Sequence, residues 1–155
     1  MARQGPKLTG LLAVLAAMLP AMVFLACPAA ATGTLFCSID DQNVSFELLG
    51  STRIPDGTIV EVHKGHLTLK TSPGVAKALS FPLTKDDIIM QCTLDRDLRF
   101  AIRVDDPDNA RSIVLAIIAV RNEKLEKYLG RYEVEFAGGK PAKALSGKIK
   151  SCEGD

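Results

Sequence analysis

Beyond residue 31, short stretches of alternating apolar and polar residues are separated by clusters of turn-forming residues. In residues 98–104 every second residue is a large apolar one, and arginines stand at two of the three positions between them. A period of two places the large apolar side chains on one face of a β-strand. Turn clusters recur at residues 40–43, 54–57, 72–74 and 105–109. This spacing is typical of hairpin connections and predicts an all-β domain.

About eight to ten short strands are expected, which predicts a single antiparallel β-sandwich or, as the alternative, a partly open barrel. One run departs from alternation, because residues 113–120 are apolar throughout and rich in β-branched residues. Such a composition favours a central strand covered on both faces over a buried helix. Residues 122–128 are polar, and Glu123 and Lys127 have the spacing that supports one helical turn. A last strand is expected at residues 144–151.

The N-terminal segment has the three parts of a bacterial-type signal peptide in their usual order. Two positively charged residues and no acidic ones precede an apolar run from Leu11 to Leu25. Small residues follow at positions 29–31, where a signal peptidase would cut after Ala31. We therefore expect a signal peptide at residues 1–31 and an exported β-rich domain at residues 32–155, periplasmic or secreted.

Two other interpretations of this segment remain open. The apolar stretch is long enough for an uncleaved membrane anchor, but Pro20 and Pro28 interrupt it and no positive cluster follows. A lipoprotein signal would use Cys27 as the lipid acceptor. Phe24 and Leu25 are unusual residues for the positions that such a signal requires before the cysteine. We expect cleavage with no stable membrane span afterwards, and a lipoprotein anchored through Cys27 is the minor alternative.

The composition of the exported part argues against nucleic acid as a partner. The chain has 19 Lys and Arg against 18 Asp and Glu. Loss of Arg3 and Lys7 with the signal leaves 17 against 18, which gives no positive field to attract phosphates. The chain also has no Trp and only two Tyr, whereas surfaces that bind single strands need exposed aromatic side chains. We expect no nucleic-acid partner.

Three cysteines remain after cleavage, and an oxidising compartment allows two of them to form a disulfide. We expect this bridge between Cys37 and Cys152, on the first predicted strand and at the end of the last, because the termini of a domain often lie close together. Cys92 alternates with Met90 and Leu94. This position predicts a reduced, buried thiol that acts as a small apolar core residue.

No strong catalytic motif is present. The chain contains neither the Gly-x-Ser-x-Gly element that presents a catalytic serine nor the Gly-x-x-x-x-Gly-Lys-Ser/Thr loop that holds phosphates. Asp95 and Asp97 have the spacing of a carboxylate pair, but carboxylates in such a turn commonly just solvate it. Residues 105–109 are rich in oxygen ligands for calcium but lack the layout of a calcium-binding loop. These observations favour a protein that is not an enzyme.

The segment from Thr58 to Thr71 carries the candidate site. Its pattern predicts a hairpin with Lys64-Gly65 as the two-residue turn. In that register His63 and His66 face each other on the polar side, close enough to share one metal ion, and Glu61 would add a carboxylate. Imidazole and carboxylate ligands suit zinc or copper. The competing interpretation is that these residues are polar decoration at a hairpin tip, with no cofactor.

Together these features predict a non-catalytic exported binding or interaction module of the bacterial envelope. Its partner would be another envelope protein or a small ligand. The alternative is a metal-binding protein or weak metalloenzyme that uses Glu61, His63 and His66. A secreted inhibitor of a foreign enzyme also fits the size and the predicted fold, without support from particular residues.

Overall fold

The computed structural model describes residues 31–54, 56–71, 75–94, 96–138 and 143–154. The predicted signal peptide, its two alternatives and Cys27 lie outside these residues, apart from Ala31. Thr32, the first residue after the predicted cleavage position, begins the first strand. Within the described part of the chain, no helix has the length and apolar character needed to cross a membrane.

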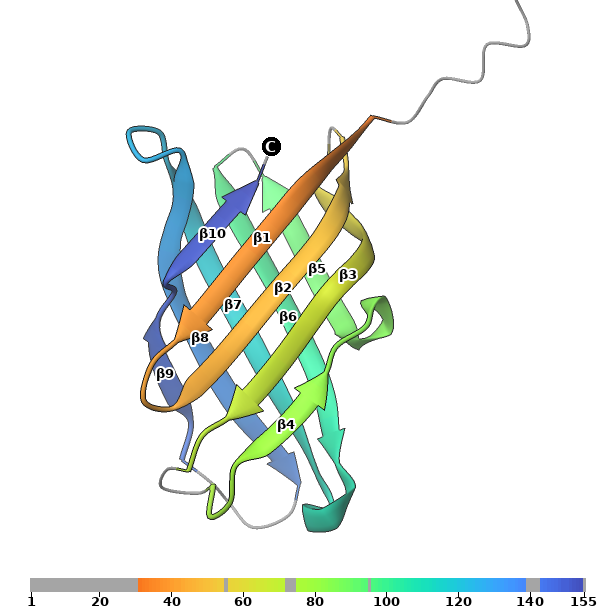
Figure 1. Ribbon diagram of the computed structural model, residues 1–155, viewed down its shortest axis with the longest axis vertical. Coiled ribbons are helices and arrows are strands. Elements are labelled where there is room, and N and C mark those ends of the chain that lie inside the picture. The colour runs from red at the N-terminus through yellow and green to blue at the C-terminus, as the bar shows by residue number, and fades with distance from the viewer. Residues whose placement is uncertain (1–30, 55, 72–74, 95, 139–142, 155) are drawn as a thin grey trace, which may run out of the picture. The chain divides into compact units, whose positions relative to one another are not determined.

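The described residues form ten strands and two short 3₁₀ turns (Figure 1). The strands are β1 (Thr32–Asp40), β2 (Val44–Arg53), β3 (Thr58–Leu69), β4 (Leu79–Pro82), β5 (Ile88–Leu94), β6 (Asp97–Asp106), β7 (Arg111–Asn122), β8 (Lys127–Gly138), β9 (Leu145–Lys148) and β10 (Ser151–Gly154). The 3₁₀ turns are η2 (Lys85–Asp87) and η3 (Pro107–Asn109). The all-β prediction is confirmed.

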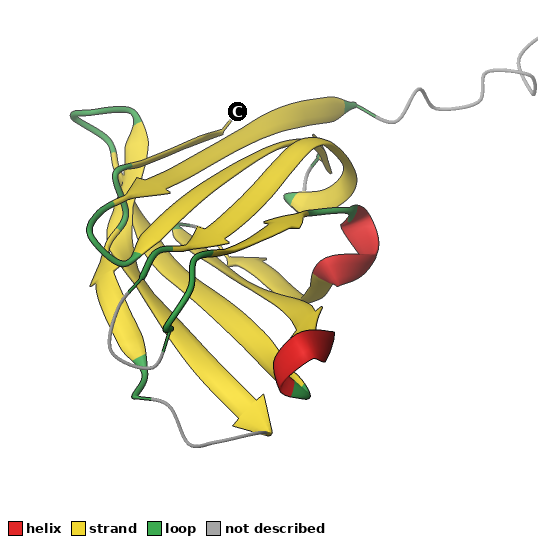
Figure 2. Cartoon of the chain, turned by 60° about the horizontal axis from the view of Figure 1, so that its bottom comes forward, coloured by secondary structure: helices red, strands yellow, loops and turns green. Residues whose placement is uncertain are grey.

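All ten strands belong to one antiparallel sheet, in the order β4-β3-β2-β1-β10-β8-β7-β6-β5, with β9 paired to β8 beside this path. Strands β1 to β4 form a first meander and β5 to β8 a second, and β10 lies between β1 and β8. The sheet curves into an open half-barrel in which the two meanders face each other (Figure 2). The predicted two-sheet sandwich is therefore wrong, and the alternative of a partly open barrel is closer to the observed fold.

The last predicted strand explains the difference between a sandwich and one continuous sheet. Residues 144–151 do not form one strand, because β9 pairs with β8 and the chain turns at Ile149 and Lys150 before β10. β10 then pairs with β1 over four residue pairs and with β8 through Cys152 and Tyr128. Since β10 has a partner on each side, it joins the two meanders instead of leaving two separate sheets.

The inner face of the half-barrel is an apolar core to which both meanders contribute. The alternation predicted for residues 98–104 is confirmed, because its large apolar side chains are buried while the two arginines are exposed. Across the interior, the rings of Phe46 on β2 and Phe100 on β6 have centroids 6.4 Å apart. The other largest fully buried side chains are Tyr132, Ile39, Leu48, Ile59, Leu67, Leu69, Ile102, Ile113, Leu115 and Ile117.

The open side of the half-barrel lies between the two edge strands, β4 and β5. β4 pairs only with residues 66–69 of β3, which leaves the earlier part of β3 beside β5. There the Oε1 of the Gln91 side chain on β5 accepts a hydrogen bond from the backbone N–H of Ile59 on β3 at 3.0 Å, where no described strand pairs with β3 on that side. Next to it, the N–H of buried Leu83 donates to the Gly65 carbonyl at 2.9 Å. A side chain and the η2 connection therefore hold this side together.

The polar segment after β7 is a hairpin turn, so the predicted helical turn at residues 122–128 is wrong. The Asn122 side chain accepts hydrogen bonds from the N–H groups of Lys124 and Leu125 at 3.1 and 3.2 Å. Glu126 adopts a left-handed conformation with φ of 52°. Local bonds from an Asn side chain and a left-handed residue are features of turns, and they outweigh the helical spacing of the charges.

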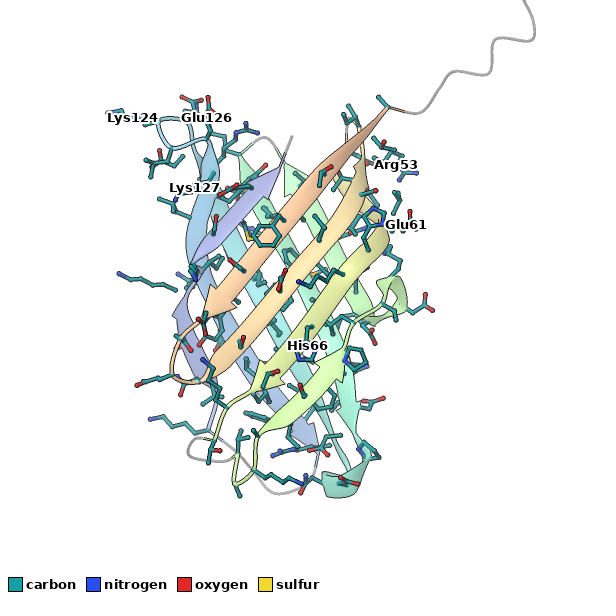
Figure 3. All side chains as sticks on the ribbon, in the orientation of Figure 1. Arg53, Glu61, His66, Lys124, Glu126 and Lys127 are labelled. Atoms are coloured by element: carbon teal, nitrogen blue, oxygen red, sulfur yellow. A yellow bond between two sulfur atoms is a disulfide. The ribbon has the colours of Figure 1, made fainter. Side chains whose placement is uncertain are left out.

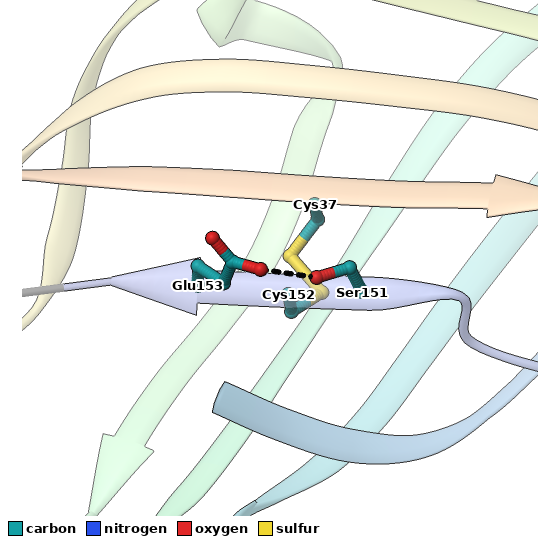
Figure 4. The surroundings of a disulfide bond; sticks show 4 residues. All are labelled: Cys37, Ser151, Cys152 and Glu153. Atoms are coloured by element: carbon teal, nitrogen blue, oxygen red, sulfur yellow. Dashed lines mark hydrogen bonds between the residues drawn. A yellow bond between two sulfur atoms is a disulfide. The ribbon is translucent and has the colours of Figure 1, made fainter. Parts of the chain in front are cut away.

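The predicted disulfide between Cys37 and Cys152 is present (Figure 4). The two residues are buried and directly opposed on β1 and β10, with Cα atoms 4.0 Å apart. Cys92 is free, as predicted, but it is exposed and does not belong to the core. The register of β5 shifts between Ile88 and Met90, so that Ile88 faces inward whereas Met90 and Cys92 lie on the outer face. The bulge shifts the alternation of β5 by one residue, so that Cys92 faces outward although the sequence pattern predicted that it faces the core.

Asp41 fastens the turn between β1 and β2 to the second meander. One carboxylate oxygen accepts hydrogen bonds from the N–H groups of Asn43 and Val44 at 2.8 and 2.9 Å. The other accepts a hydrogen bond from the hydroxyl of buried Tyr132 on β8 at 2.5 Å. A Cβ atom at Gly147 would lie 2.4 Å from this carboxylate, so the glycine leaves the space in which the contact forms.

These contacts determine the ionisation of both groups. Burial raises the pKa of Asp41, but the hydrogen bonds from Tyr132 and from the turn's N–H groups outweigh it and hold this pKa below its usual range. Burial, and then the hydrogen bond to Asp41, raise the pKa of Tyr132. At neutral pH the pair is therefore an ionised carboxylate and a neutral phenol that donates to it.

Replacing both bridged cysteines, as Cys37→Ala with Cys152→Ala, should lower the free energy of unfolding by about 4–5 kcal/mol. The bridge closes a loop with a sequence separation of 115, and its loss returns that freedom to the unfolded chain. Denaturant unfolding measures the change. Cys92→Ser is the control, and it should change stability by less than about 0.5 kcal/mol because Cys92 is exposed. Equal effects of the two replacements would contradict the structural role of the bridge.

Tyr132→Phe should destabilise the fold by about 1.5–3 kcal/mol at neutral pH, because a hydrogen bond to a carboxylate is lost while the ring still fills the core. The pKa of Asp41 is lowered in the folded state, so its contribution is present above the unfolded pKa and is lost as pH falls through the folded pKa. The difference in stability between the wild type and this variant should therefore shrink below about pH 4. Denaturant unfolding between neutral and acid pH tests this, with Tyr128→Phe as the control. A difference that persists unchanged in acid would rule out the Asp41 contact as its source.

Candidate functional site

The predicted histidine hairpin does not form, because β3 runs without interruption through Lys64 and Gly65. These two residues pair with Leu49 and Leu48 on β2. Gly65 marks a close approach, since a Cβ atom there would lie 2.7 Å from the Leu83 Cβ. A glycine inside a strand often has this packing role, and here it was mistaken for the second residue of a turn. The hairpin prediction is therefore wrong.

Both histidines lie on the outer face of the first meander. The register of β2 and β3 shifts between Leu49 and Gly50, which makes His63 the extra residue of a β-bulge. The His63 Nε2 shares a hydrogen bond with the Ser51 hydroxyl at 2.6 Å, and its Nδ1 lies 3.9 Å from the Glu61 carboxylate. The His66 Nε2 lies 2.9 Å from the Thr68 hydroxyl and 2.8 Å from that of Ser80. In Figure 3, Glu61 and His66 are labelled on separate stretches of β3.

This arrangement differs from the opposed pair on which the metal hypothesis was based. Lys64 follows His63 on the same face and forms an ion pair with Glu47 at 2.8 Å. Within the ranges that the structure describes, no three His, Cys, Asp or Glu side chains gather in a way that could hold a metal ion. Zinc or copper binding through Glu61, His63 and His66 stays a prediction, and its geometry would have to form on a bulged strand.

The oxygen-rich residues 105–109 close the hairpin between β6 and β7 around η3. Asp106 is buried and accepts hydrogen bonds from Asn109 at 2.8 Å and from Arg111 at 3.0 Å. Burial raises the pKa of Asp106, but these hydrogen bonds and the charge of Arg111 outweigh it and hold this pKa below its usual range. The buried Asp106 carboxylate therefore forms hydrogen bonds within the loop that close the hairpin.

A shallow pocket of about 440 Å³ lies beside this hairpin and is lined in part by Asp106 and Arg111. Because these two charged groups pair with each other, we assign no ligand to the pocket. Of the two carboxylates that might have formed a catalytic pair, Asp95 lies outside the described residues, and Asp97 pairs with Arg99 at 2.7 Å.

The outer face of the second meander carries a feature that the sequence analysis missed. β7 is apolar on both faces, and only its inward residues are in the core. On the outward face, Ile118 is 38% exposed and Val120 is 50% exposed. The expectation that residues 113–120 are covered on both faces is therefore wrong, since no described residue covers the outward side chains of Ile118 and Val120. An antiparallel sheet can leave one face to solvent, but that face is then usually polar.

Neighbouring strands extend this apolar surface. Met90 on β5 is opposite Ala101 on β6, which is opposite Ala116 on β7, and Val120 is opposite Leu129 on β8. Met90 and Leu129 are also exposed. We call the connected surface the outer stripe, and its members are Met90, Ala101, Val114, Ala116, Ile118, Val120 and Leu129.

Charged residues flank the outer stripe on both sides. On β6 the flanking charges are Asp97, Arg99 and Arg103, and on β8 they are Arg131, Glu133 and Glu135. Arg99 is held by Asp97. For the other four, the residues that the structure describes provide no hydrogen bond or ion pair. The outer stripe is therefore an apolar strip bordered by charges, of which Arg103, Arg131, Glu133 and Glu135 have no partner among the described residues.

The sequence did contain a signal for this surface. Arg99 and Arg103 are the polar positions of residues 98–104, so the outer face of β6 had to be exposed to solvent. Because β7 pairs with β6, its outer face had to be exposed as well. The composition of residues 113–120 alone could not reveal this, since it does not identify the neighbouring strand.

Comparison of the chain with protein-family models, with curated proteins and with solved structures finds no match.

The metal hypothesis predicts measurable binding of Cu²⁺ or Zn²⁺ that is lost in His63→Ala. Binding should strengthen as pH rises through about 6 to 7, because imidazole must be neutral to act as a ligand. Isothermal titration of both proteins measures this, with Ser51→Ala as a control that removes a hydrogen-bond partner of His63 but no ligand. Equal weak binding by the wild type and His63→Ala would leave these histidines as exposed polar residues.

Proposed function

We propose that the domain is a non-catalytic exported interaction module of the bacterial envelope, and that it contacts its partner through the outer stripe. The observation that carries the proposal is the row of outward apolar residues on β7, bordered by charged residues. Single exposed apolar residues are ordinary on a protein surface, whereas contiguous apolar patches with a polar rim are typical of interaction sites. An apolar centre with a charged rim also matches the anatomy of protein interfaces.

The interior of the half-barrel supports an outer rather than an inner binding surface. Large side chains from both meanders fill it, including Phe46, Phe100 and Tyr132. The buried ionisable groups with shifted pKa values are also tied to the fold, since Asp41 and Tyr132 bind each other and Asp106 closes a turn. Perturbed groups in a catalytic site would instead face a cleft that admits substrate.

Export is part of the proposal, and two features support it. The N-terminal segment has the order of charge, apolar run and small residues that signal peptidases recognise. The Cys37–Cys152 disulfide is of a kind that persists in oxidising compartments outside the cytoplasm. Fractionation of cells that express the full chain would test this, since a protein that stayed in the cytoplasm with residues 1–31 attached would exclude it.

The contact surface is tested by placing one charge in the outer stripe. Val120→Asp should reduce the share of the protein found in complexes by about tenfold or more, because a carboxylate at an apolar contact must lose its hydration. The matched control is Val60→Asp on β3, since Val60 has a similar exposed fraction of 42% but lies on the first meander. Size separation of gently extracted envelope protein measures the complexes, and melting curves establish that both variants fold. Equal loss in the two variants, or loss in neither, would contradict the proposal.

A further inference from the structure

We propose that the partner of the outer stripe is a second copy of this chain, bound face to face about a two-fold axis that runs along β7. This inference rests on the proposed function, because it uses the same surface. It is carried by the signs of the charges on the two flanks. In the part of each strand next to Val114 and Ala116, the β6 flank presents Arg103 and the β8 flank presents Glu133 and Glu135.

The register places these charges in rows across the sheet. Arg103, Val114 and Glu135 form one row, so the two charges lie on opposite sides of an apolar residue, two strand spacings or about 10 Å apart. The structure has no ion pair between them, and none of the described residues pairs with either of them. In this row, each end therefore offers an unmatched charge, and the opposite charge is present at the other end of the same row.

A two-fold axis along β7 matches these ends. Such an axis turns the second copy over, so that its β8 lies above β6 of the first and its β7 lies above β7. The same patch then binds itself, as in the isologous interfaces of most homodimers. Arg103 of each copy meets Glu135 of the other, which gives two equivalent ion pairs at the rim. Between them, Val114, Ala116, Ile118 and Val120 meet their own counterparts.

In the same geometry, Glu133 of one copy lies above Ala101 of the other, and two arginines face each other in the row of Arg99. Arg99, Ile118 and Arg131 form one row, so Arg131 of the second copy lies above Arg99. Arg99 is already held by Asp97 at 2.7 Å, which places an ion pair rather than a single cation below that arginine. The exported chain is close to neutral, with 17 Lys and Arg against 18 Asp and Glu after removal of Arg3 and Lys7 from the total of 19. Net charge therefore does not oppose association of two copies.

Charge reversal on the two flanks distinguishes this arrangement from other partners. Alone, Arg103→Glu places like charges at both rim pairs of a homodimer, and so does Glu135→Arg. An equimolar mixture of the two variants restores both pairs in the mixed dimer. We expect each single variant to raise the dimer dissociation constant by about tenfold or more, and the mixed dimer to return to within roughly threefold of the wild type.

The measurement is sedimentation of purified protein, exported from the full chain, across a series of concentrations up to about 1 mM. Every protein carries Cys92→Ser, because an exposed free thiol could link two copies covalently. The controls for net charge are Lys77→Glu and Asp86→Arg, which are exposed residues outside the outer stripe and should leave the dissociation constant unchanged.

The possible outcomes separate this inference from the proposed function. A monomer at every concentration, single variants that dimerise like the wild type, or a mixture no tighter than its components would each overturn the second copy as partner. If the purified protein is monomeric while Val120→Asp still removes complexes from the envelope extract, the outer stripe binds a different protein. If Val120→Asp changes neither measurement, both proposals fail.

Discussion

The half-barrel depends on β10, the short strand that joins its two meanders. β10 pairs with β8 through one residue pair, Cys152 with Tyr128, whereas β1 and β2 share nine. So short a ladder contributes few backbone hydrogen bonds, and the disulfide from Cys152 to Cys37 holds β10 against β1 at the same position. In the chain-entropy model, a bridge that closes so long a loop strongly restricts the unfolded chain. The disulfide is therefore located at β10, the strand whose pairing with β8 is the shortest in the sheet.

Joining the meanders determines which face of every strand is inside. Two polar contacts on the inner side or at the seam hold the meanders together, those of Tyr132 with Asp41 and of Gln91 with Ile59. On the outside, the two meanders differ although they are built alike. The outward face of β2 includes Ser45, Glu47 and Ser51, which are polar, whereas that of β7 is apolar from Val114 to Val120. The curvature of the sheet does not cause this difference, so it belongs to the sequence of β7.

Local patterns were enough to predict most of the strands and much of the core, because period-two alternation acts within a single strand. They failed where a neighbouring element decides the outcome. Gly65 was taken for a turn residue because its contact with Leu83 comes from a distant part of the chain. Cys92 was placed in the core because the bulge between Ile88 and Met90 leaves no mark in the alternation. The sandwich was preferred because nothing in residues 144–151 indicates that they bridge β8 and β1.

Intrinsic strand preference is the competing explanation of the outer stripe, since valine and isoleucine favour strands even when exposed. It accounts for Val114, Ile118 and Val120 taken one at a time. It does not account for Leu129 and Met90, whose side chains are not β-branched and yet extend the same surface onto two other strands. It also applies equally to β2, whose outward face is largely polar. A preference that acts residue by residue would not place Arg103 and Glu135 on opposite sides of Val114. The proposed contact with a complementary surface would account for the apolar centre and the charged borders together.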